Sequence, residues 1–340
     1  MNKIRIGTRG SKLALKQASL VQEAILRADS GIETEIVVVH TKGDKIQDKP
    51  LTEIGDKGVF ASELEKSLQN REIDIAVHSA KDLPMILGKG LDIVAVLPRG
   101  DVRDVLVLPK GGELPVFAES GMESDGVLNG GRGTPERLDK KFVIGTGSRR
   151  RQQQAGQIWK NVVCENIRGN VDTRLQKLKN SNSETIGGGI AYQGILLAKA
   201  GLDRLDMISR YETEFDFYPL SPEQFLPAAC QGIIAVEALQ GAPAALCREI
   251  TDAETELYFG VEREVLSALS ADCSEAIAAW CRQEADGLTL DVMYAGNRQR
   301  LVCGADRQSE TESGKETARL QAGLAMARQA AKSVKEKGFE

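Results

Sequence analysis

The sequence predicts an α/β protein with two consecutive α/β units and a smaller α+β domain at its end. Short apolar runs alternate with amphipathic helical patterns over the first hundred residues, and the alternation resumes up to about residue 240. From about residue 241 a helical pattern, a hairpin pattern and a last helical pattern follow. At 340 residues the chain is long enough for two or three domains.

The first unit reads as strands and helices in alternation. Residues 11–26 predict a helix with one apolar side, and residues 59–70 predict another, in which Phe60, Leu64 and Leu68 recur every four positions. Apolar runs predict strands at 4–8, 34–40, 73–79 and 91–98. Strands that alternate with helices in this way indicate a mostly parallel sheet.

The second unit repeats the alternation, and the last domain departs from it. In the second unit we expect strands at 104–109 and 142–147 and helices at 148–159, from 168 to 180 and at 194–205, followed by a strand within 226–238. In the last domain we expect a helix at 253–270, a hairpin within 288–306 that turns at Asn297–Arg298, and a terminal helix at 316–338.

Composition and charge exclude several classes of protein. A hydrophobic content of 41% and a charged content of 27% are typical of a soluble globular protein. No run approaches the roughly 18 apolar residues of a membrane helix, and the first residues lead directly into a strand pattern, so we expect a cytoplasmic protein. A net charge of −5 argues against a general nucleic-acid surface. Six cysteines without a C-x-x-C pair and only two histidines predict neither a zinc site nor a disulfide framework.

Arginines gather at three places where a strand pattern ends and a helix pattern begins. These are Arg9 with Ser11, Arg149–Arg151 after Gly-Thr-Gly-Ser, and Arg168 with Arg174 on either side of the expected cap Asn170. Helix N-termini attract anions, and the arginine fork binds carboxylates with two hydrogen bonds. An acidic protein with this arrangement is predicted to bind a small polyanion; the alternative is a set of solvated basic turns. The spacing matches neither a Walker loop nor a dinucleotide fingerprint.

A further polar group stands at the end of the buried strand 73–79. The stretch "VHSAKDLP" places Lys81 and Asp82 beyond the apolar run and is stopped by Pro84. Ligands of α/β proteins bind at such strand ends. Asp82 is therefore a candidate functional carboxylate, with a simple loop cap as the alternative. His78 is expected to be a paired core histidine rather than a catalyst.

Cysteine chemistry centres on one residue. Cys273 follows the first helix of the last domain in "SADCSEA" and could be a nucleophile, an attachment point or a bystander. The other five cysteines lie in or beside apolar runs, and we expect them to pack in the core.

Eight motifs, in order, resemble the porphobilinogen deaminase family over essentially the whole chain. They are "RIGTRGSKLALKQA", "TKGDKIQDKPL", "DKGVFASELE", "DIAVHSAKDLP", "GTGSRRRQ", "RGNVDTRLQKL", "AGLDRL" and "LPAACQG". The resemblance implies a transferase that condenses four porphobilinogen molecules head to tail and releases ammonia and hydroxymethylbilane. It also implies a dipyrromethane cofactor, held by a thioether to one cysteine. Because every pyrrole carries an acetate and a propionate, the arginine loops would bind carboxylates.

The resemblance implies roles for single residues. Asp82 would be the catalytic acid, and Cys273 would carry the cofactor. Lys81, Ser148, Arg150, Arg151 and Arg168 would bind the cofactor, and Arg9, Ser11, Gln17, Arg151 and Arg174 would bind the substrate. Arg149 is left out, because the family does not generally place an arginine there. No metal is expected.

The fold that the resemblance implies has three domains. Two doubly wound α/β domains like those of periplasmic binding proteins enclose the active-site cleft, and a smaller α+β domain carries the cofactor on a loop. The expected bounds are 1–100 with 214–240, 101–213, and 241–340. The expected partner is porphobilinogen, without nucleic acid or membrane, and the expected state is a monomer.

Three features depart from the family pattern. The cysteine loop reads Ala271-Asp272-Cys273 and then Ser274-Glu275-Ala276, where the family usually has two glycines before the cysteine and a proline soon after. The stretch 111–141 is longer than the family norm, and 181–193 contains extra residues.

The main alternative is a binding protein for a small dicarboxylate with two α/β domains and no chemistry. It predicts no covalent adduct and has no need of a third domain. The complete "HSAKDLP" motif and the lack of an export signal favour the enzyme.

Overall fold

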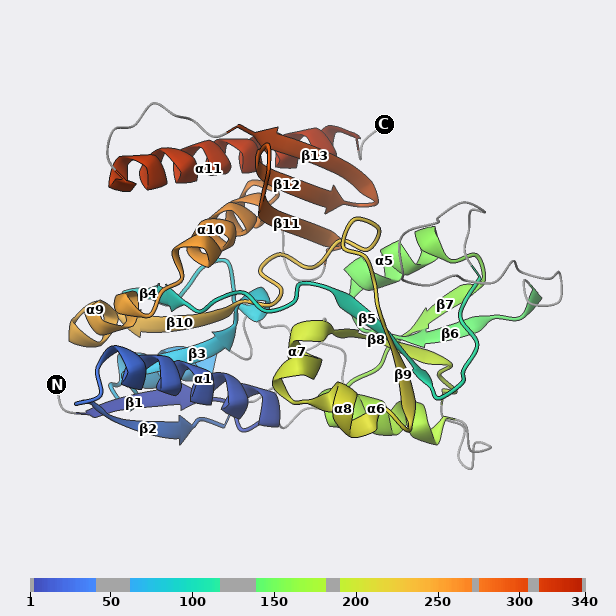
Figure 1. The fold of residues 1–340 in the computed structure, drawn as a ribbon, viewed down its shortest axis with the longest axis horizontal. Helices are drawn as coiled ribbons and strands as arrows, with labels where there is room; N and C mark the ends of the chain where they lie inside the picture. The colour runs from blue at the N-terminus through green and yellow to red at the C-terminus, as the bar shows by residue number, and fades with distance from the viewer. Residues whose placement is uncertain are drawn as a thin grey trace.

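The structure is a computed structural model that describes residues 3–40, 62–116, 139–181, 190–270, 275–304 and 312–337. These residues form two five-stranded sheets and one three-stranded sheet. Figure 1 shows the first sheet in blue and cyan with the gold strand β10 inserted, the second in green and yellow with the teal strand β5 inserted, and the third in orange and red beside the last helix. The predicted class, two doubly wound α/β units with a smaller α+β domain, is confirmed.

The first sheet has the strand order β2-β1-β3-β10-β4. Its strands are β1 (Lys3–Thr8), β2 (Glu33–Val38), β3 (Ile75–Ser79), β4 (Leu91–Val96) and β10 (Ile234–Leu239). β1 runs parallel to β2 and β3, whereas β10 is antiparallel to both β3 and β4. The sheet is therefore mostly parallel, as predicted, with one reversed strand that arrives from late in the chain.

Helices α1 (Lys12–Ala28), α3 (Ser62–Gln69) and α9 (Ala242–Glu249) pack on this sheet. Helix α3 buries Leu64 and Leu68, as its spacing predicted, while Phe60 lies outside the described residues. Ala244 and Cys247 of α9 are buried in the first-sheet core. Residues 242–249 were expected in the last domain, but their apolar side packs on the first sheet.

The second sheet has the equivalent order β7-β6-β8-β5-β9. Its strands are β5 (Asp104–Pro109), β6 (Phe142–Gly145), β7 (Val162–Glu165), β8 (Gly194–Ala198) and β9 (Phe215–Pro219), and its helices are α5 (Arg149–Ile158), α6 (Val171–Asn180), α7 (Lys199–Arg204) and α8 (Met207–Tyr211). β5 is antiparallel to β8 and β9, so this sheet too has one reversed strand. In each sheet the reversed strand is the one that enters from the other unit.

Two expectations for the second unit were wrong. Residues 194–198 form β8 rather than the start of a helix, because the short apolar run pairs with β5 and β6 in the middle of the sheet. Residues 215–219 pair with β5 and so belong to the second sheet, although 214–240 was assigned to the first domain. The chain returns to the first sheet only at β10. The remaining domain bounds stay predictions.

The last domain consists of α10 (Ala253–Ala268), the antiparallel strands β11 (Ile277–Glu284), β12 (Gly287–Tyr294) and β13 (Asn297–Cys303), and α11 (Glu312–Lys337). Both helices bury apolar side chains against the sheet. The hairpin turns at Ala295 and Gly296, with φ of 47° and 89°, rather than at Asn297–Arg298. Two residues with positive φ match the twist of a tight hairpin, which favours this turn.

Two segments cross between the α/β units: residues 97–103, the first crossover, and residues 220–233, the second crossover. They run side by side in Figure 1 and are joined by a hydrogen bond of 3.1 Å from Gly100 N to Gly232 O. Arg99 forms an ion pair of 2.7 Å with the fully buried Glu262 of α10. Glu262 also accepts backbone hydrogen bonds from Cys230 and Cys281. This carboxylate therefore connects both crossovers to the last domain.

Candidate active site

The strand β3 ends in a short turn that presents Lys81 and Asp82. Ser79 is paired with Ile234 of β10, and a 3-10 turn of Ala80–Asp82 follows. Ala80 N donates to Ile233 O at 3.0 Å, and the buried side chains of Ala80 and Leu83 anchor the turn in the core. Lys81 is half-buried, and Asp82 is exposed. The polar side chains therefore lie at a strand end, as predicted.

Helix α1 begins beside this turn. Ser11 caps the helix, with its hydroxyl accepting from Ala14 N at 3.3 Å. The buried Gln17 forms two hydrogen bonds with Ser79, of 2.9 and 3.2 Å. Arg9 is half-buried at the end of β1. Ser11 and Gln17 thus have structural contacts of their own, and Gln17 lies at the end of β3.

Helix α5 supplies two buried arginines that meet one carboxylate. Arg150 and Arg151 lie 2.8 and 2.7 Å from the oxygens of Asp104, which is the first residue of β5 and is fully buried. Arg149, excluded from the predicted site, is exposed. Positive charge in the first turn of a helix is unfavourable, because it opposes the helix dipole. A bound anion was expected to offset this unfavourable interaction, and the carboxylate of Asp104 offsets part of it. Asp104 was not among the predicted site residues.

A second residue of this hydrogen-bond network, Gln231, was also absent from the predicted site residues. The fully buried Gln231 accepts a hydrogen bond from Lys81 Nζ at 3.3 Å and donates to Val102 O at 2.8 Å and to Asp104 Oδ1 at 3.2 Å. It therefore links the turn after β3 to the start of β5. Gln231 stands in the quoted motif "LPAACQG", which was the only available signal, and no role had been assigned to it.

Helix α6 brings the third arginine pair to the same region. Asn170 caps the helix through Thr173 N at 2.9 Å, as predicted. Arg174 Nε donates to Gly169 O at 2.8 Å. Burial, together with the positive charges of Arg151 and Arg168, lowers the pKa of Arg174 to about 10, while Asp82 counters part of this shift. Arg174 therefore lies near Asp82 as well as near Arg151 of α5.

Helix α5 is capped in the same manner. Ser148 Oγ accepts from Arg151 N at 3.4 Å, and Ser148 N donates to Thr146 Oγ1 at 3.2 Å. The hydroxyl hydrogen of a capping serine stays available for a ligand, because one serine oxygen can both accept and donate.

Desolvation affects the other charges of this region. Burial lowers the pKa of Lys81 to about 8, partly countered by Asp82. Burial by itself would raise the pKa of Asp104, but Arg150 and Arg151 outweigh it and hold the pKa at about 2. Burial also lowers the pKa of Arg150. We call Lys81, Arg150, Arg151 and Arg174, with Asp82 and Asp104, the charge cluster: four cations face two carboxylates.

Of the predicted site residues, Cys273 lies outside the described residues. Cys230, Cys247 and Cys281 are buried, which confirms them as packing residues, and burial raises the pKa of Cys247 to about 12. His78 Nε2 lies 2.9 Å from Glu237 Oε2, so His78 is the paired core histidine that was expected.

Three comparisons place this geometry among known proteins. The family described as "Porphobilinogen deaminase, dipyromethane cofactor binding domain" matches residues 4–246. A porphobilinogen deaminase of Alkaliphilus oremlandii is 37% identical over 312 residues, covering 91% of this chain and 93% of the relative. The porphobilinogen deaminase of Nitrobacter hamburgensis is 34% identical over 339 residues, covering 98% and 93%. A solved solute-binding protein specific for aromatic acid ligands, from a marine metagenome, covers 100% of both chains at 10% identity with a TM-score of 0.37, which adds nothing to the assignment.

Proposed function

The chain belongs to the porphobilinogen deaminase family, and from this we infer that it is a transferase of tetrapyrrole synthesis. It deaminates four porphobilinogen molecules, condenses them head to tail and releases ammonia and hydroxymethylbilane. The observation that supports placing this chemistry at the charge cluster is its excess of desolvated positive charge. Buried cations are stable only when they are paired, so the cluster favours a ligand that carries several carboxylates.

The family's dipyrromethane cofactor fits this donor set. Its acetate and propionate groups would supply the negative charge that Asp82 and Asp104 do not. When bound, the cofactor supplies the pyrrole primer to which substrate rings are added. We propose that Lys81, Ser148, Arg150, Arg151 and Arg168 hold its carboxylates and that Cys273 carries it through a thioether.

For the substrate we propose residues from both α/β units. Arg9, Ser11 and Gln17 lie on the first unit, and Arg151 and Arg174 lie on the second. The Ser11 hydroxyl accepts a hydrogen bond from Ala14 N of the helix and keeps its own hydrogen for a carboxylate. Porphobilinogen would thus lie between the two units, with its acetate and propionate paired to arginine.

Asp82 is the proposed catalytic residue. The aminomethyl nitrogen of porphobilinogen must leave with its proton, and positive charge then develops on the substrate ring. An exposed carboxylate next to Lys81 can accept hydrogen bonds from this nitrogen and from the pyrrole N–H, and it stabilises the developing charge. On either side of Asp82, Lys81 would hold a carboxylate of the cofactor and Arg174 a carboxylate of the substrate.

Intact mass and product formation test the proposal together. The purified wild type should carry a mass increment of two linked pyrrole rings and convert porphobilinogen to hydroxymethylbilane. Cys273→Ser should lose both, whereas the control Cys303→Ser should keep both. A wild type without an adduct and without product would favour the dicarboxylate-binding alternative. An unchanged increment in Cys273→Ser would place the attachment elsewhere. A cytoplasmic location and a monomeric state stay predictions.

A further inference from the structure

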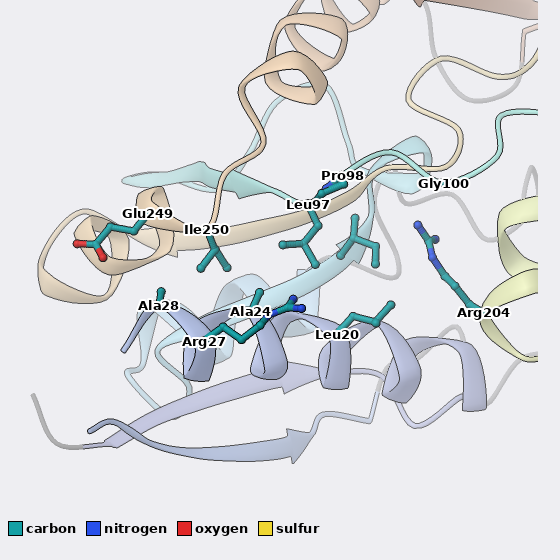
Figure 2. Close-up of a pocket in the computed structure, with 11 residues that line it drawn as sticks. Leu20, Ala24, Arg27, Ala28, Leu97, Pro98, Gly100, Arg204, Glu249 and Ile250 are labelled. Carbon is teal, nitrogen blue, oxygen red and sulfur yellow. The ribbon is translucent and has the colours of Figure 1, made fainter. Parts of the chain in front are cut away.

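A pocket of about 540 Å³ lies beside the crossovers and shares no residue with the charge cluster. Helix α1, the first crossover, the start of β10 and the end of α9 line it, and α7 of the second unit closes one end. Figure 2 shows α1 on one side of the pocket and β10 with α9 on the other. Its volume falls within the range of roughly 300–1,000 Å³ that small-molecule sites occupy.

Apolar side chains form most of the lining. Ala24, Leu97 and Ile234 are buried, and Leu20 and Ile250 are half-buried. They come from four separate segments, namely α1, the first crossover, β10 and the residue after α9, and Ala24, Leu97, Ile234, Leu20 and Ile250 all belong to the first-sheet core. A surface of this kind favours the apolar body of a ligand.

Positive charge stands at the end that α7 closes. Arg204 reaches the pocket from the second unit, and its Nη2 donates to Gly232 O at 2.5 Å. Burial lowers the pKa of Arg204 to about 10. Its neighbour Asp203 is paired with Lys199 at 2.8 Å, and no carboxylate in the described part of the chain forms an ion pair with Arg204. A guanidinium has five donors, so most of those of Arg204 stay available to a ligand.

The remaining charges of the lining agree with an anionic ligand. Arg27 of α1 adds a second positive charge, and Figure 2 shows it running along the helix on the pocket side. The one acidic lining residue, Glu249, is exposed and lies at the end opposite Arg204. The pocket therefore combines an apolar floor with a cationic end.

We propose that this pocket binds a small carboxylate with an apolar body. The carboxylate would pair with Arg204, and the body would lie against Leu97 and Ile234. Since Arg204 belongs to the second unit and the floor belongs to the first, the ligand would connect the two units beside the crossovers. This site goes beyond the proposed function, whose substrate and cofactor would bind at the charge cluster.

Binding of cyclohexanecarboxylate to the purified full-length protein, measured by isothermal titration calorimetry, tests the proposal. Cyclohexanemethanol, a neutral molecule of similar shape, should bind at least tenfold more weakly, because it cannot pair with a guanidinium. Arg204→Gln should weaken carboxylate binding at least tenfold. The control Arg210→Gln changes an exposed arginine outside the lining and should leave the affinity unchanged.

Two further variants separate this site from the charge cluster and from loss of folding. Arg174→Ala should leave the binding that depends on Arg204 intact, because Arg174 is not in the pocket. Leu20→Trp, at a half-buried lining position on the part of α1 nearer to Arg204, should fill the proposed site and abolish binding while the circular dichroism spectrum stays native. The proposal is overturned if no binding occurs at millimolar concentration, if the alcohol binds equally well, or if Arg204→Gln and Leu20→Trp both bind like the wild type.

Discussion

Buried charge determines what single residues do in the candidate active site. Asp104 forms ion pairs with Arg150 and Arg151, and all three side chains are buried. The carboxylate therefore keeps the two arginines in place before any ligand adds its own negative charge. Asp82 is different, because it is exposed and available to a substrate. The two carboxylates of the cluster thus have separate roles, one structural and one proposed as catalytic.

The catalytic role of Asp82 predicts a selective loss of rate. Asp82→Asn should keep the covalent cofactor and still bind porphobilinogen, because Lys81 and the arginines are unchanged. The rate of hydroxymethylbilane formation should fall by about two orders of magnitude or more, the usual effect of removing a positioned acid–base group. The exposed Asp92→Asn is the control and should retain wild-type kcat. Near wild-type turnover in Asp82→Asn would show that the assignment is wrong.

The structural role of Asp104 predicts a loss of stability. Asp104→Asn leaves two buried arginines without their carboxylate and should lower the free energy of unfolding at pH 7 by ~3–5 kcal/mol, as measured by urea denaturation. The exposed Asp203→Asn should change it by about 0.5 kcal/mol or less.

The stability difference between wild type and Asp104→Asn should also depend on pH. The pKa of Asp104 is about 2 in the folded state, against an unfolded value of 3.8. Its stabilisation is thus fully present above the unfolded value and is lost as the pH falls toward 2; the shift corresponds to about 2 kcal/mol. The stability difference between wild type and Asp104→Asn should therefore be constant above about pH 5 and shrink below pH 4. A difference that stays constant down to pH 2.5 would contradict this pKa.

The crossovers are the elements that bring the site together. Gln231 in the second crossover connects Lys81 with Asp104, and the next residue, Gly232, has φ of +90°. A Cβ atom at Gly232 would lie 2.5 Å from the carbonyl oxygen of Gly100 in the first crossover. The close approach of the two crossovers therefore requires glycine at position 232.

Gly232→Ala is therefore expected to be strongly destabilising. Strained φ alone costs on the order of 1–3 kcal/mol, and the backbone contact adds to it. The matched change Gly156→Ala lies on the exposed side of α5, where nothing is within 4 Å of a new Cβ, and it should stabilise the protein by roughly 0.5–1 kcal/mol. Thermal and urea unfolding of the two variants measure the contrast. If both variants were equally stable, the two crossovers could move apart at Gly100 and position 232 without lowering the free energy of unfolding, and the prediction would be wrong.

At the scale of the whole molecule, the ion pair between Arg99 and Glu262 joins the last domain to the crossovers of the two α/β units. The Arg99 side chain is 9% exposed and that of Glu262 is fully buried, and Glu262 also accepts hydrogen bonds from the backbone of the second crossover and of β11. Another acidic residue of the same helix, Glu264, pairs with Arg328 at a more exposed position. Helix α10 thus carries a buried and an exposed ion pair two positions apart.

These two ion pairs should differ in strength. Glu262→Gln leaves Arg99 buried without a counter-charge and should destabilise the protein by ~3–5 kcal/mol, with faster amide exchange in α10 and β11. Glu264→Gln should cost ~0–1 kcal/mol and leave amide exchange unchanged. Hydrogen exchange with mass spectrometry reports both. If the two variants behave alike, the buried pair does not hold the last domain.

Local patterns in the sequence were enough to predict most helices and several strands. The apolar spacing of α3, the cap Asn170 of α6 and the buried strands β1 and β3 all depend on neighbours within a few residues, and the structure confirms them. The motifs also predicted which strand-end loops carry the candidate site residues, because ligands of α/β folds bind where strands end. These features were predictable since helix and strand periodicity is a local property.

The contacts between distant segments could be decided only by the tertiary structure. β8 was taken for a helix because its short apolar run has no distinguishing period, and its pairing with β5 and β6 determines its conformation. Asp104 meets Arg151 across 47 positions and Gln231 across 127. No local pattern encodes such partners, because the pairing of a buried charge depends on which strand ends the folded chain brings together.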